Sequence, residues 1–523
     1  MNSSIIEIAF DTPMTHGRSS LDYNPLVCWR SSTGKHLVVP AFHHSGSEWR
    51  ARLLPTVIGN WTYTVYNHTP SGTPIAAGEV EVSHIDKRGQ LRARPHSPWH
   101  FAYDDGTVPF LLGDTVYNLV GVAYSGHDYE AFLRKRKAQG FNLIRVRAAV
   151  SPYHPNTPFS AWMTADCWLW SGSPQCPDYT RFNTRYLEAI EAVLDACARH
   201  DIAVELIAEA WLMEAPFNQR DRFLPEHEEL LIRELVARFG AHPALALWCV
   251  ANEYNLYQKP TSASINDWYA RRLARLFRHY DGHRKLVANH VTAAEHLEFT
   301  FQERFRNTAD IDVLLMQYWG KIDTKQNAAL CLGMEDELRR SVADADQSVI
   351  MAEYGYETPG SHDKCFPGHE LLGPSHNRRG ALRSLFLGIP IITGFENTWG
   401  PLFKPEHDPV GITCFTHIRK LFTEYVDFTI LSPKENRFTF ESVVEGDTPL
   451  SLLQEDGRGL VYLPMGGTLQ WSYAPDSTGW KWFNPRTGEC IAVAPQFESH
   501  RFTLTSPIES DEAGCPADWV LIT

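Results

Sequence analysis

Two glutamates, 100 positions apart, each end a short apolar run: Glu253 closes the run 244–253 (ALALWCVANE) and Glu353 closes the run 348–353 (SVIMAE). Runs of this length and composition are typical of strands buried in a parallel sheet. Parallel α/β barrels carry their chemistry at the C-terminal ends of such strands. Two carboxylates at that edge can share one glycosidic bond, one as acid/base and the other as nucleophile. The pair therefore predicts a glycoside hydrolase that needs no cofactor and no metal.

The neighbours of the two glutamates suggest their roles. Asn252 directly precedes Glu253, and an amide at this position can hold a sugar hydroxyl while the glutamate protonates the leaving oxygen. The alternative for Glu253 is a cap on the following helix. The alternative for Glu353 is a loop carboxylate in a salt bridge. Glu357, in the polar aromatic cluster after Glu353, is the rival nucleophile.

Other polar and aromatic residues close predicted strands and are candidates for lining the site. Arg145 and Arg147 share one face of a strand, so either could hold a carboxylate ionised, and an ordinary salt bridge explains each equally well. Glu209 is the strongest alternative acid. The candidate substrate-binding residues are Asp114, Asn118, Arg145, Arg147, Trp168, Glu209, Trp211, Asn252, His290, Tyr318, Trp319, Glu396 and Trp399.

The connection from Ser151 to Thr180 is long and contains Trp162, Trp168 and Trp170. Long ordered loops in compact domains are usually functional. Because aromatic faces suit sugar rings, we expect this segment to overhang the two glutamates and close one end of the site. Closure at one end would make the enzyme exo-acting. A hydrophobic lid without ligand contact is the alternative.

The segments that must position these residues alternate between strand-like and helix-like from about Trp99 onward, which indicates a parallel sheet. Strands are predicted at 110–114, 141–149, 203–209, 244–253, 286–290, 311–319, 348–353 and 391–396. Helices are predicted at 129–140, 186–200, 225–239 and 379–387. A doubly wound sheet would need fewer repeats and a glycine-rich phosphate turn. The pattern therefore predicts an α/β fold of the (β/α)8 TIM-barrel type.

Short alternating strands with turn residues lie on both sides of the predicted barrel, and 523 residues suggest about three domains. We expect an N-terminal antiparallel β-sandwich over residues 1–88, a catalytic barrel over 96–430 and a C-terminal antiparallel β-sandwich over 431–523. A basic, turn-rich linker is predicted from Asp86 to Pro98.

Composition narrows the partners. A net charge of −14 argues against nucleic acid, and no apolar stretch reaches membrane-spanning length. The N-terminus lacks the features of a signal peptide, and ten cysteines without a CxxC pair argue against a zinc or redox motif. We expect a cytoplasmic protein that acts on a small carbohydrate, with no nucleic-acid or membrane partner. The sequence leaves a homo-oligomer open.

Three motifs resemble the apiosidase-like catalytic domain family, a group of barrel glycosidases similar to clan A. They are PFLLGDTVYNL (109–119), RKAQGFNLIRV (136–146) and MAEYGYE (351–357). The flanking segments resemble the small β domains that accompany this family, so the resemblance covers nearly the whole chain. It implies an acid/base after the fourth strand and a nucleophile after the seventh, which correspond to Glu253 and Glu353. We expect the last domain to be a structural sandwich.

One motif departs from the family. Many members end the fourth strand in Gly-Gly-Asp, whereas this chain has Ala251-Asn252-Glu253, the more general clan A pattern. Because of this departure, the resemblance gives no reason to expect apiose as the substrate sugar. Hydrolysis with retention of the anomeric configuration is still expected. Other functions stay open: a carbohydrate-binding protein on an inactive barrel, a transglycosylase that uses the same residues, and a metal-dependent hydrolase or lyase. The last would need clustered His and Asp ligands, and the histidines are dispersed.

Overall fold

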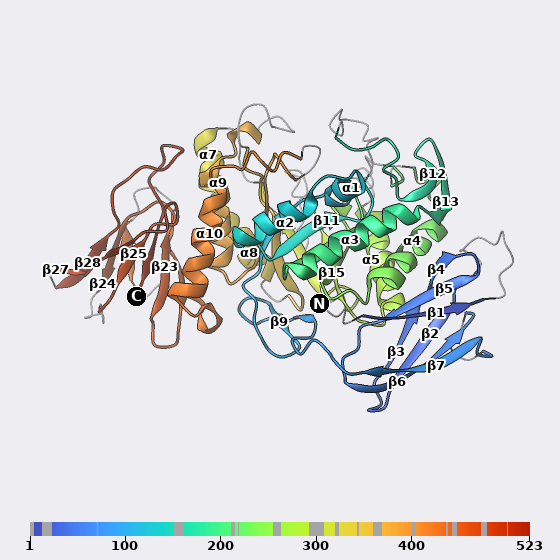
Figure 1. Cartoon of the computed structure of the whole chain (residues 1–523). Coiled ribbons are helices and arrows are strands. Elements are labelled where there is room, and N and C mark those ends of the chain that lie inside the picture. Colours follow the sequence, from blue (N-terminus) through green and yellow to red (C-terminus); the bar gives the residue numbers. More distant parts are fainter. Residues whose placement is uncertain are drawn as a thin grey trace.

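A central barrel lies between two antiparallel β regions on opposite sides of it (Figure 1). The computed structural model describes residues 5–12, 23–68, 70, 72–150, 162–210, 215–217, 219–254, 263–291, 308–319, 324–342, 345–358, 369–399, 403–435, 438–441, 447–471, 478–498 and 500–523.

The barrel closes on itself through eight strands that pair in parallel in chain order, and the last pairs with the first. Its strands are β10 (Leu112–Thr115), β11 (Leu143–Arg147), β14 (Ala203–Glu209), β15 (Leu245–Ala251), β16 (Leu286–His290), β17 (Val313–Gln317), β18 (Ser348–Glu353) and β19 (Ile391–Gly394). Most of their residues are buried on both faces, as expected of strands covered by helices. The predicted TIM-barrel fold is confirmed.

Helices cover the outside of the barrel (Figure 1). They are α1 (Leu119–Tyr124), α2 (Tyr129–Ala138), α3 (Thr184–Arg199), α4 (Pro225–Phe239), α5 (Ala263–Tyr280), α7 (Lys325–Leu330), α8 (Met334–Val342), α9 (Pro374–Leu385) and α10 (Ile412–Lys420), with short turns η3 (His369–Leu371), η4 (Leu421–Tyr425) and η5 (Phe428–Ile430). α9 begins five residues before the predicted start, at Pro374, because proline fits the first turn of a helix.

A short hairpin closes the N-terminal end of the barrel. It consists of β8 (Leu91–Ala93) and β9 (Phe101–Tyr103), so part of the predicted linker is a strand. Leu91 and Phe101 share an apolar cluster with the inward-facing residues of the barrel strands. The Ser348 hydroxyl, at the start of β18, donates to the His100 carbonyl at 2.7 Å. The hairpin is therefore the floor of the barrel, opposite the strand ends that carry the glutamates.

The N-terminal region contains two antiparallel sheets around Trp29 and Trp61, which are fully buried. The strands are β1 (Ile6–Asp11), β5 (Glu48–Leu53) and β4 (Phe42–Ser45) in one sheet, and β3 (His36–Pro40), β2 (Leu26–Ser31), β6 (Gly59–Tyr66) and β7 (Ala76–Val82) in the other. Arg52 Nη1 donates to the Arg238 carbonyl at the end of α4 at 2.7 Å, which ties this region to the barrel.

The C-terminal region also contains two antiparallel sheets. One holds β20 (Ser432–Lys434), β22 (Leu450–Leu453), β23 (Gly459–Leu463), β29 (Trp519–Ile522), β25 (Lys481–Phe483) and β26 (Cys490–Ala492), and the other β21 (Thr439–Glu441), β24 (Thr468–Trp471), β28 (Arg501–Thr505) and β27 (Gln496–Glu498). Tyr462 packs on Phe386, directly after α9, with ring centroids 5.3 Å apart. The larger sheet thus shares an apolar core with the barrel helices.

Candidate active site

Glu253 and Glu353 lie at the C-terminal ends of β15 and β18 and share one hydrogen-bond donor. The side-chain amide of Gln317 donates from Nε2 to Glu253 Oε1 at 3.0 Å and to Glu353 Oε1 at 2.9 Å. Gln317 ends β17, the strand that pairs with β18. Because one nitrogen touches both carboxylates, the two face the same space at one end of the barrel.

Glu353 receives two further donors at its other oxygen. Tyr117 Oη donates to Glu353 Oε2 at 2.9 Å, and Arg145 Nη1 lies 3.2 Å from the same atom. Arg145 Nη1 also donates to Tyr117 Oη at 2.7 Å, so the phenol is both donor and acceptor. Burial, followed by the charges of Glu353 and Glu253, holds the pKa of Tyr117 well above its usual value, so the phenol stays protonated.

Arg145 organises the floor of this site. It is fully buried, and its guanidinium reaches Glu205 Oε1 at 3.1 Å, Glu353 and the side-chain carbonyl of Asn252. Glu205 lies inside the barrel on β14, where burial raises its pKa and Arg145 opposes that shift. Breaking a buried ion pair by removing one partner is costly because the other charge is left uncompensated. The guanidinium, on β11, therefore fixes the positions of residues on or next to three other barrel strands, β14, β15 and β18.

His290 is buried beside Arg145 and is held as a neutral ring. Its Nδ1 lies 3.0 Å from Arg145 Nη2, 2.8 Å from the side-chain oxygen of Asn252 and 3.4 Å from the Glu253 backbone nitrogen. Because these neighbours include both donors and an acceptor, the contacts do not select one tautomer of the ring. Burial and the Arg145 charge lower the pKa of His290 well below its usual value. Asn252 Nδ2 and His290 Nε2 are buried without a hydrogen-bond partner among the described residues, so the amide donor and the ring nitrogen are both available to a ligand.

The backbone at Glu253 is itself unusual. Its φ is +50°, in the left-handed region that side-chain-bearing residues seldom adopt. Conformations of this kind persist only when surrounding contacts enforce them, and they concentrate at functional sites. The contacts of Gln317 with the Glu253 carboxylate and of His290 with its backbone N–H are such constraints.

An aromatic wall stands beside Glu353. The Tyr356 ring packs against Trp319, with centroids 5.8 Å apart, and against Trp399 at 5.2 Å. Trp399 also meets the Tyr117 ring edge-on at 5.6 Å and donates its indole N–H to Glu396 Oε2 at 3.0 Å. Burial and Glu353 raise the pKa of Tyr356 well above its usual value. This places Trp319, Trp399 and Glu396 around the cluster that holds the nucleophile candidate.

Several predicted site residues belong to other networks. Asp114 binds Arg136 of α2 at 2.6 Å in the layer between barrel and helices, and burial raises its pKa to about 6. The Tyr318 phenol donates to the Leu332 carbonyl. Arg147 donates to the Asn118 side chain, and its guanidinium lies 5.6 Å from the Tyr117 ring centroid, so Arg147 packs on Tyr117.

Glu209 lies in a separate charged cluster. Its Oε2 accepts from Arg220 at 3.2 Å, and the same guanidinium donates to Glu228, which also binds Arg272 at 2.5 Å. Burial and the nearby Glu228 charge raise the pKa of Glu209 to about 8. Trp211, the other residue predicted at this strand end, lies outside the described residues.

The described part of the expected lid is a hairpin of β12 (Trp170–Ser173) and β13 (Cys176–Phe182). Trp168 and Trp170 are buried and pack on each other at 5.0 Å, and Trp170 packs edge-on against Phe223 near α4 at 5.5 Å. These tryptophans therefore pack in the core between the hairpin and the helix, and a sugar contact of Trp168 stays a prediction. Residues 151–161 lie outside the described part of the chain.

Glu357, the rival nucleophile, caps a helix. Its Oε1 accepts the backbone N–H of Gly411, the residue before α10, at 2.9 Å. A Cβ on Gly411 would lie 2.2 Å from Glu357 Oε2, so glycine permits the close approach. Burial raises the pKa of Glu357 to about 7, and the Gly411 contact opposes that shift.

Sequence reasoning missed Tyr117, Gln317 and Glu205. Strand alternation could have found two of them. Val313 and Leu315 face the barrel interior, so Gln317 must as well. Glu205 is a charge inside an apolar strand, and such a charge needs a partner on a neighbouring strand. Tyr117 lies two residues beyond β10, where alternation no longer applies.

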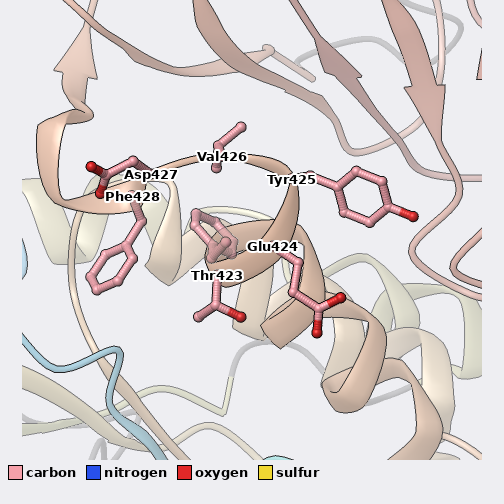
Figure 2. Close-up of a pocket in the computed structure, with 7 residues that line it drawn as sticks. Thr423, Glu424, Tyr425, Val426, Asp427 and Phe428 are labelled. Atoms are coloured by element: carbon pink, nitrogen blue, oxygen red, sulfur yellow. The ribbon is translucent and has the colours of Figure 1, made fainter.

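A pocket of about 410 Å³ lies elsewhere, and the single segment from Phe422 to Phe428 lines it (Figure 2). Tyr425 at its rim packs on Phe483 of the C-terminal region at 5.8 Å, which places the pocket at a domain junction. Among the described residues, no group of three or more His, Cys, Asp or Glu side chains could hold a metal ion. No helix within those residues is long and apolar enough to cross a membrane.

Comparisons with known proteins agree with this fold. A family model described as "Apiosidase-like, catalytic domain" matches residues 97–393, and one described as a domain of unknown function (DUF5060) matches residues 4–68. No curated protein matches the chain.

Three solved structures share the fold. One, from Bacteroides vulgatus ATCC 8482, is provisionally named a glycoside hydrolase. It has a TM-score of 0.66 at 15% identity over 99% of this chain and 98% of its own. A glycoside hydrolase family 5 protein from the same organism has a TM-score of 0.61 at 17% identity, over 83% and 94%. A structure titled "Glycoside hydrolase" has a TM-score of 0.60 at 15% identity, over 83% and 96%.

Proposed function

Because this chain belongs to the apiosidase-like catalytic domain family, we propose that it is a retaining glycoside hydrolase that acts through Glu253 and Glu353. The fold and the family are those of glycoside hydrolases. The observation that carries the proposal is the amide of Gln317, which joins one oxygen of each carboxylate.

The shared donor limits how far apart the carboxylates are. Glu253 Oε1 and Glu353 Oε1 can be separated by at most two hydrogen-bond lengths, because both accept from Gln317 Nε2. Retaining enzymes hold their carboxyl groups about 5–5.5 Å apart, and inverting enzymes about 6.5–9.5 Å apart to admit a water. The shared donor supports the retaining arrangement.

The contacts around each carboxylate favour one assignment of roles. Glu353 receives donors from Tyr117, Arg145 and Gln317, which suits a carboxylate that must be ionised to attack the anomeric carbon. Glu253 accepts from the neutral amide of Gln317, which suits a group that must take up and release a proton. In the first step, Glu353 forms a bond to the anomeric carbon as Glu253 protonates the departing oxygen. In the second step, Glu253 deprotonates the water that displaces Glu353.

Groups next to the carboxylates can bind the sugar. The Asn252 amide N–H is an unused donor beside the acid/base, so we assign it to a sugar hydroxyl. Tyr356, Trp319 and Trp399 offer aromatic faces and edges next to the nucleophile, where a pyranose or furanose ring can pack. The substrate class is a small oligosaccharide or glycoside in the cytoplasm. Exo action stays a prediction that rests on the length of the connection from Ser151 to Thr180.

The test is a panel of aryl pyranosides and furanosides, assayed with the wild type beside Glu253→Gln and Glu353→Gln. We expect the wild type to release the aryl group from at least one substrate, and both variants to lose turnover of substrates whose leaving group needs protonation. Glu209→Gln is the matched control, since its carboxylate lies in the Arg220 cluster. Wild-type rates in either active-site variant would contradict the proposal. Transfer of the sugar to an added alcohol in preference to water would identify a transglycosylase.

A further inference from the structure

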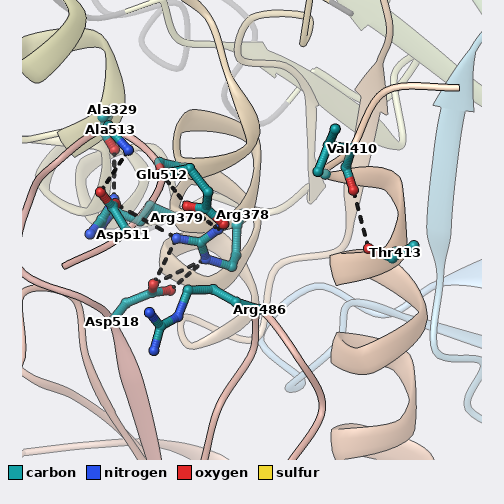
Figure 3. A network of polar contacts seen from close by, with 12 residues as sticks. Ala329, Arg378, Arg379, Val410, Thr413, Arg486, Asp511, Glu512, Ala513 and Asp518 are labelled. Carbon is teal, nitrogen blue, oxygen red and sulfur yellow. Dashed lines mark hydrogen bonds and ion pairs between the residues drawn. The ribbon is translucent and has the colours of Figure 1, made fainter. Parts of the chain in front are cut away.

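One face of α9 is fixed to the C-terminal region by buried arginines. Arg378 binds both carboxylate oxygens of Asp518 through Nε at 3.0 and 3.1 Å, and Glu512 through Nη1 at 3.0 Å (Figure 3). Arg379 binds Asp511 and donates to the Pro464 carbonyl at 3.0 Å. Both arginine side chains are fully buried. These contacts place three carboxylates of the C-terminal region on one helix of the barrel.

The other side of α9 contacts the strand ends that carry the candidate nucleophile. His376 hydrogen-bonds the carbonyl of Tyr354, the residue after Glu353. The backbone of Gly380 lies on the Tyr354 ring so closely that a Cβ there would be 2.5 Å from it. Asn377 accepts from the Thr393 hydroxyl of β19 at 2.9 Å. α9 thus stands between the C-terminal sheets and the ends of β18 and β19.

We propose that the C-terminal sandwich is a positioning element of the active site, and that Arg378 and Arg379 are positioning residues that hold α9 against the strand end carrying Glu353. The proposal rests on the proposed function for its catalytic consequence and on the contacts of α9 for its structural one. A module that is only joined by a linker would differ from this domain, because removal of such a module would leave the barrel geometry unchanged.

Two features favour a positioning role over simple attachment. Arg378 binds the carboxylates of Asp518 and Glu512. A guanidinium is planar and can bind a carboxylate through two nitrogens, so such contacts fix the orientation of the two groups as well as the distance between them. The apolar core is also continuous across the junction, where Tyr462 meets Phe386. A shift of α9 would move the His376 and Gly380 contacts to Tyr354, one residue from the nucleophile. Small displacements of a catalytic group lower rates steeply.

The test is Asp518→Asn, which removes the charge of the carboxylate bound by Arg378 and keeps the shape of the side chain. The control is Glu455→Gln, which breaks an exposed ion pair with Lys434 in the same C-terminal region, 2.8 Å long and away from α9. Each variant is assayed well below its own Tm. We expect Asp518→Asn to lower kcat about 10- to 100-fold with KM within about threefold, and the control to match the wild type. If Asp518→Asn does not fold, Glu512→Gln takes its place as the milder change at the same arginine.

Amide hydrogen exchange of the segment 353–358 provides a readout that needs no substrate. We expect faster exchange of this segment in Asp518→Asn than in the wild type, with exchange in β11 unchanged. An unchanged kcat, or unchanged exchange at 353–358, would overturn the proposal and leave the domain a stabilising attachment. If the wild type cleaves no glycoside, the proposed function fails, and the exchange measurement alone decides this inference.

Discussion

Two pairs of glutamates, each with a member at the C-terminal end of a barrel strand, differ in the group that lies between their carboxylates. The pair of Glu253 and Glu353 shares the neutral amide of Gln317. The pair of Glu209 and Glu228 shares the Arg220 guanidinium, with Arg272 as a second cation. In the second pair, one guanidinium holds both carboxylates in place. In the first pair, the group that both carboxylates contact is neutral, and Arg145 binds Glu353 from another side. The two pairs therefore differ in the charge of the group that their members share.

The largest expected effect comes from Arg145→Met, which removes a cation that binds both Glu353 and Glu205. Removing one partner of a buried ion pair costs about 3–5 kcal/mol, because the other charge is left uncompensated. We expect the free energy of unfolding to fall by about this amount, and kcat/KM to fall about 100-fold or more because Glu353 and Asn252 lose a shared anchor. Chemical denaturation and initial rates measure both. A fully active variant would show that Arg145 only stabilises the barrel.

Gln317→Leu tests the amide that distinguishes the catalytic pair. Without it the two carboxylates repel each other with no shared donor, and like charges raise the pKa of one member of such a pair. We expect kcat/KM to fall about 10- to 100-fold and the acidic limb of the pH–rate profile to move upward. The control is Gln347→Leu. Gln347 is a buried glutamine directly before β18, and its side chain donates to the Thr308 carbonyl. We expect this variant to keep the wild-type pH–rate profile. Equal pH–rate profiles for both variants would show that the Gln317 amide has no special role in catalysis.

Glu209→Gln tests the structural pair and has the smallest effect on rate. In the folded protein the pKa of Glu209 is raised to about 8, so between about pH 4.5 and 8 the folded state binds a proton that the unfolded state has released. Stability therefore falls as pH rises through this range. We expect the variant to flatten that part of the stability–pH curve and to keep kcat/KM within about twofold. A large loss of activity would instead place Glu209 in the catalytic site.

The barrel could be predicted from the sequence because its strands are buried on both faces and appear as apolar runs. β14, β16 and β18 have the predicted bounds, and so does α4. α5 was not predicted, although Ser262 before it and Gly282 after it are residue types typical of helix ends. The β8–β9 hairpin was missed because its strands are only three residues long and read as a linker.

The site was predictable only in part. Glu253, Glu353 and Asn252 could be singled out as candidates because each stands at or beside the end of an apolar run. Asp114 was chosen from the same kind of position, but its side chain points to Arg136 outside the barrel. The direction in which a side chain points follows from strand alternation and from tertiary contacts. Beyond the last residue of a strand, only the tertiary contacts determine it. This is why Tyr117, which donates to Glu353, was not found.

The most direct test of the central claim is azide rescue of Glu353→Ala and Glu253→Ala on an activated aryl glycoside, with the configuration of the glycosyl azide determined by NMR. In Glu353→Ala, azide enters the space of the nucleophile, and we predict a product of inverted configuration. In Glu253→Ala, the glycosyl-enzyme still forms on Glu353, and azide attacks it to give a product of retained configuration. Exchanged outcomes would reverse the two roles. Wild-type turnover by both variants without azide would contradict the two-glutamate mechanism.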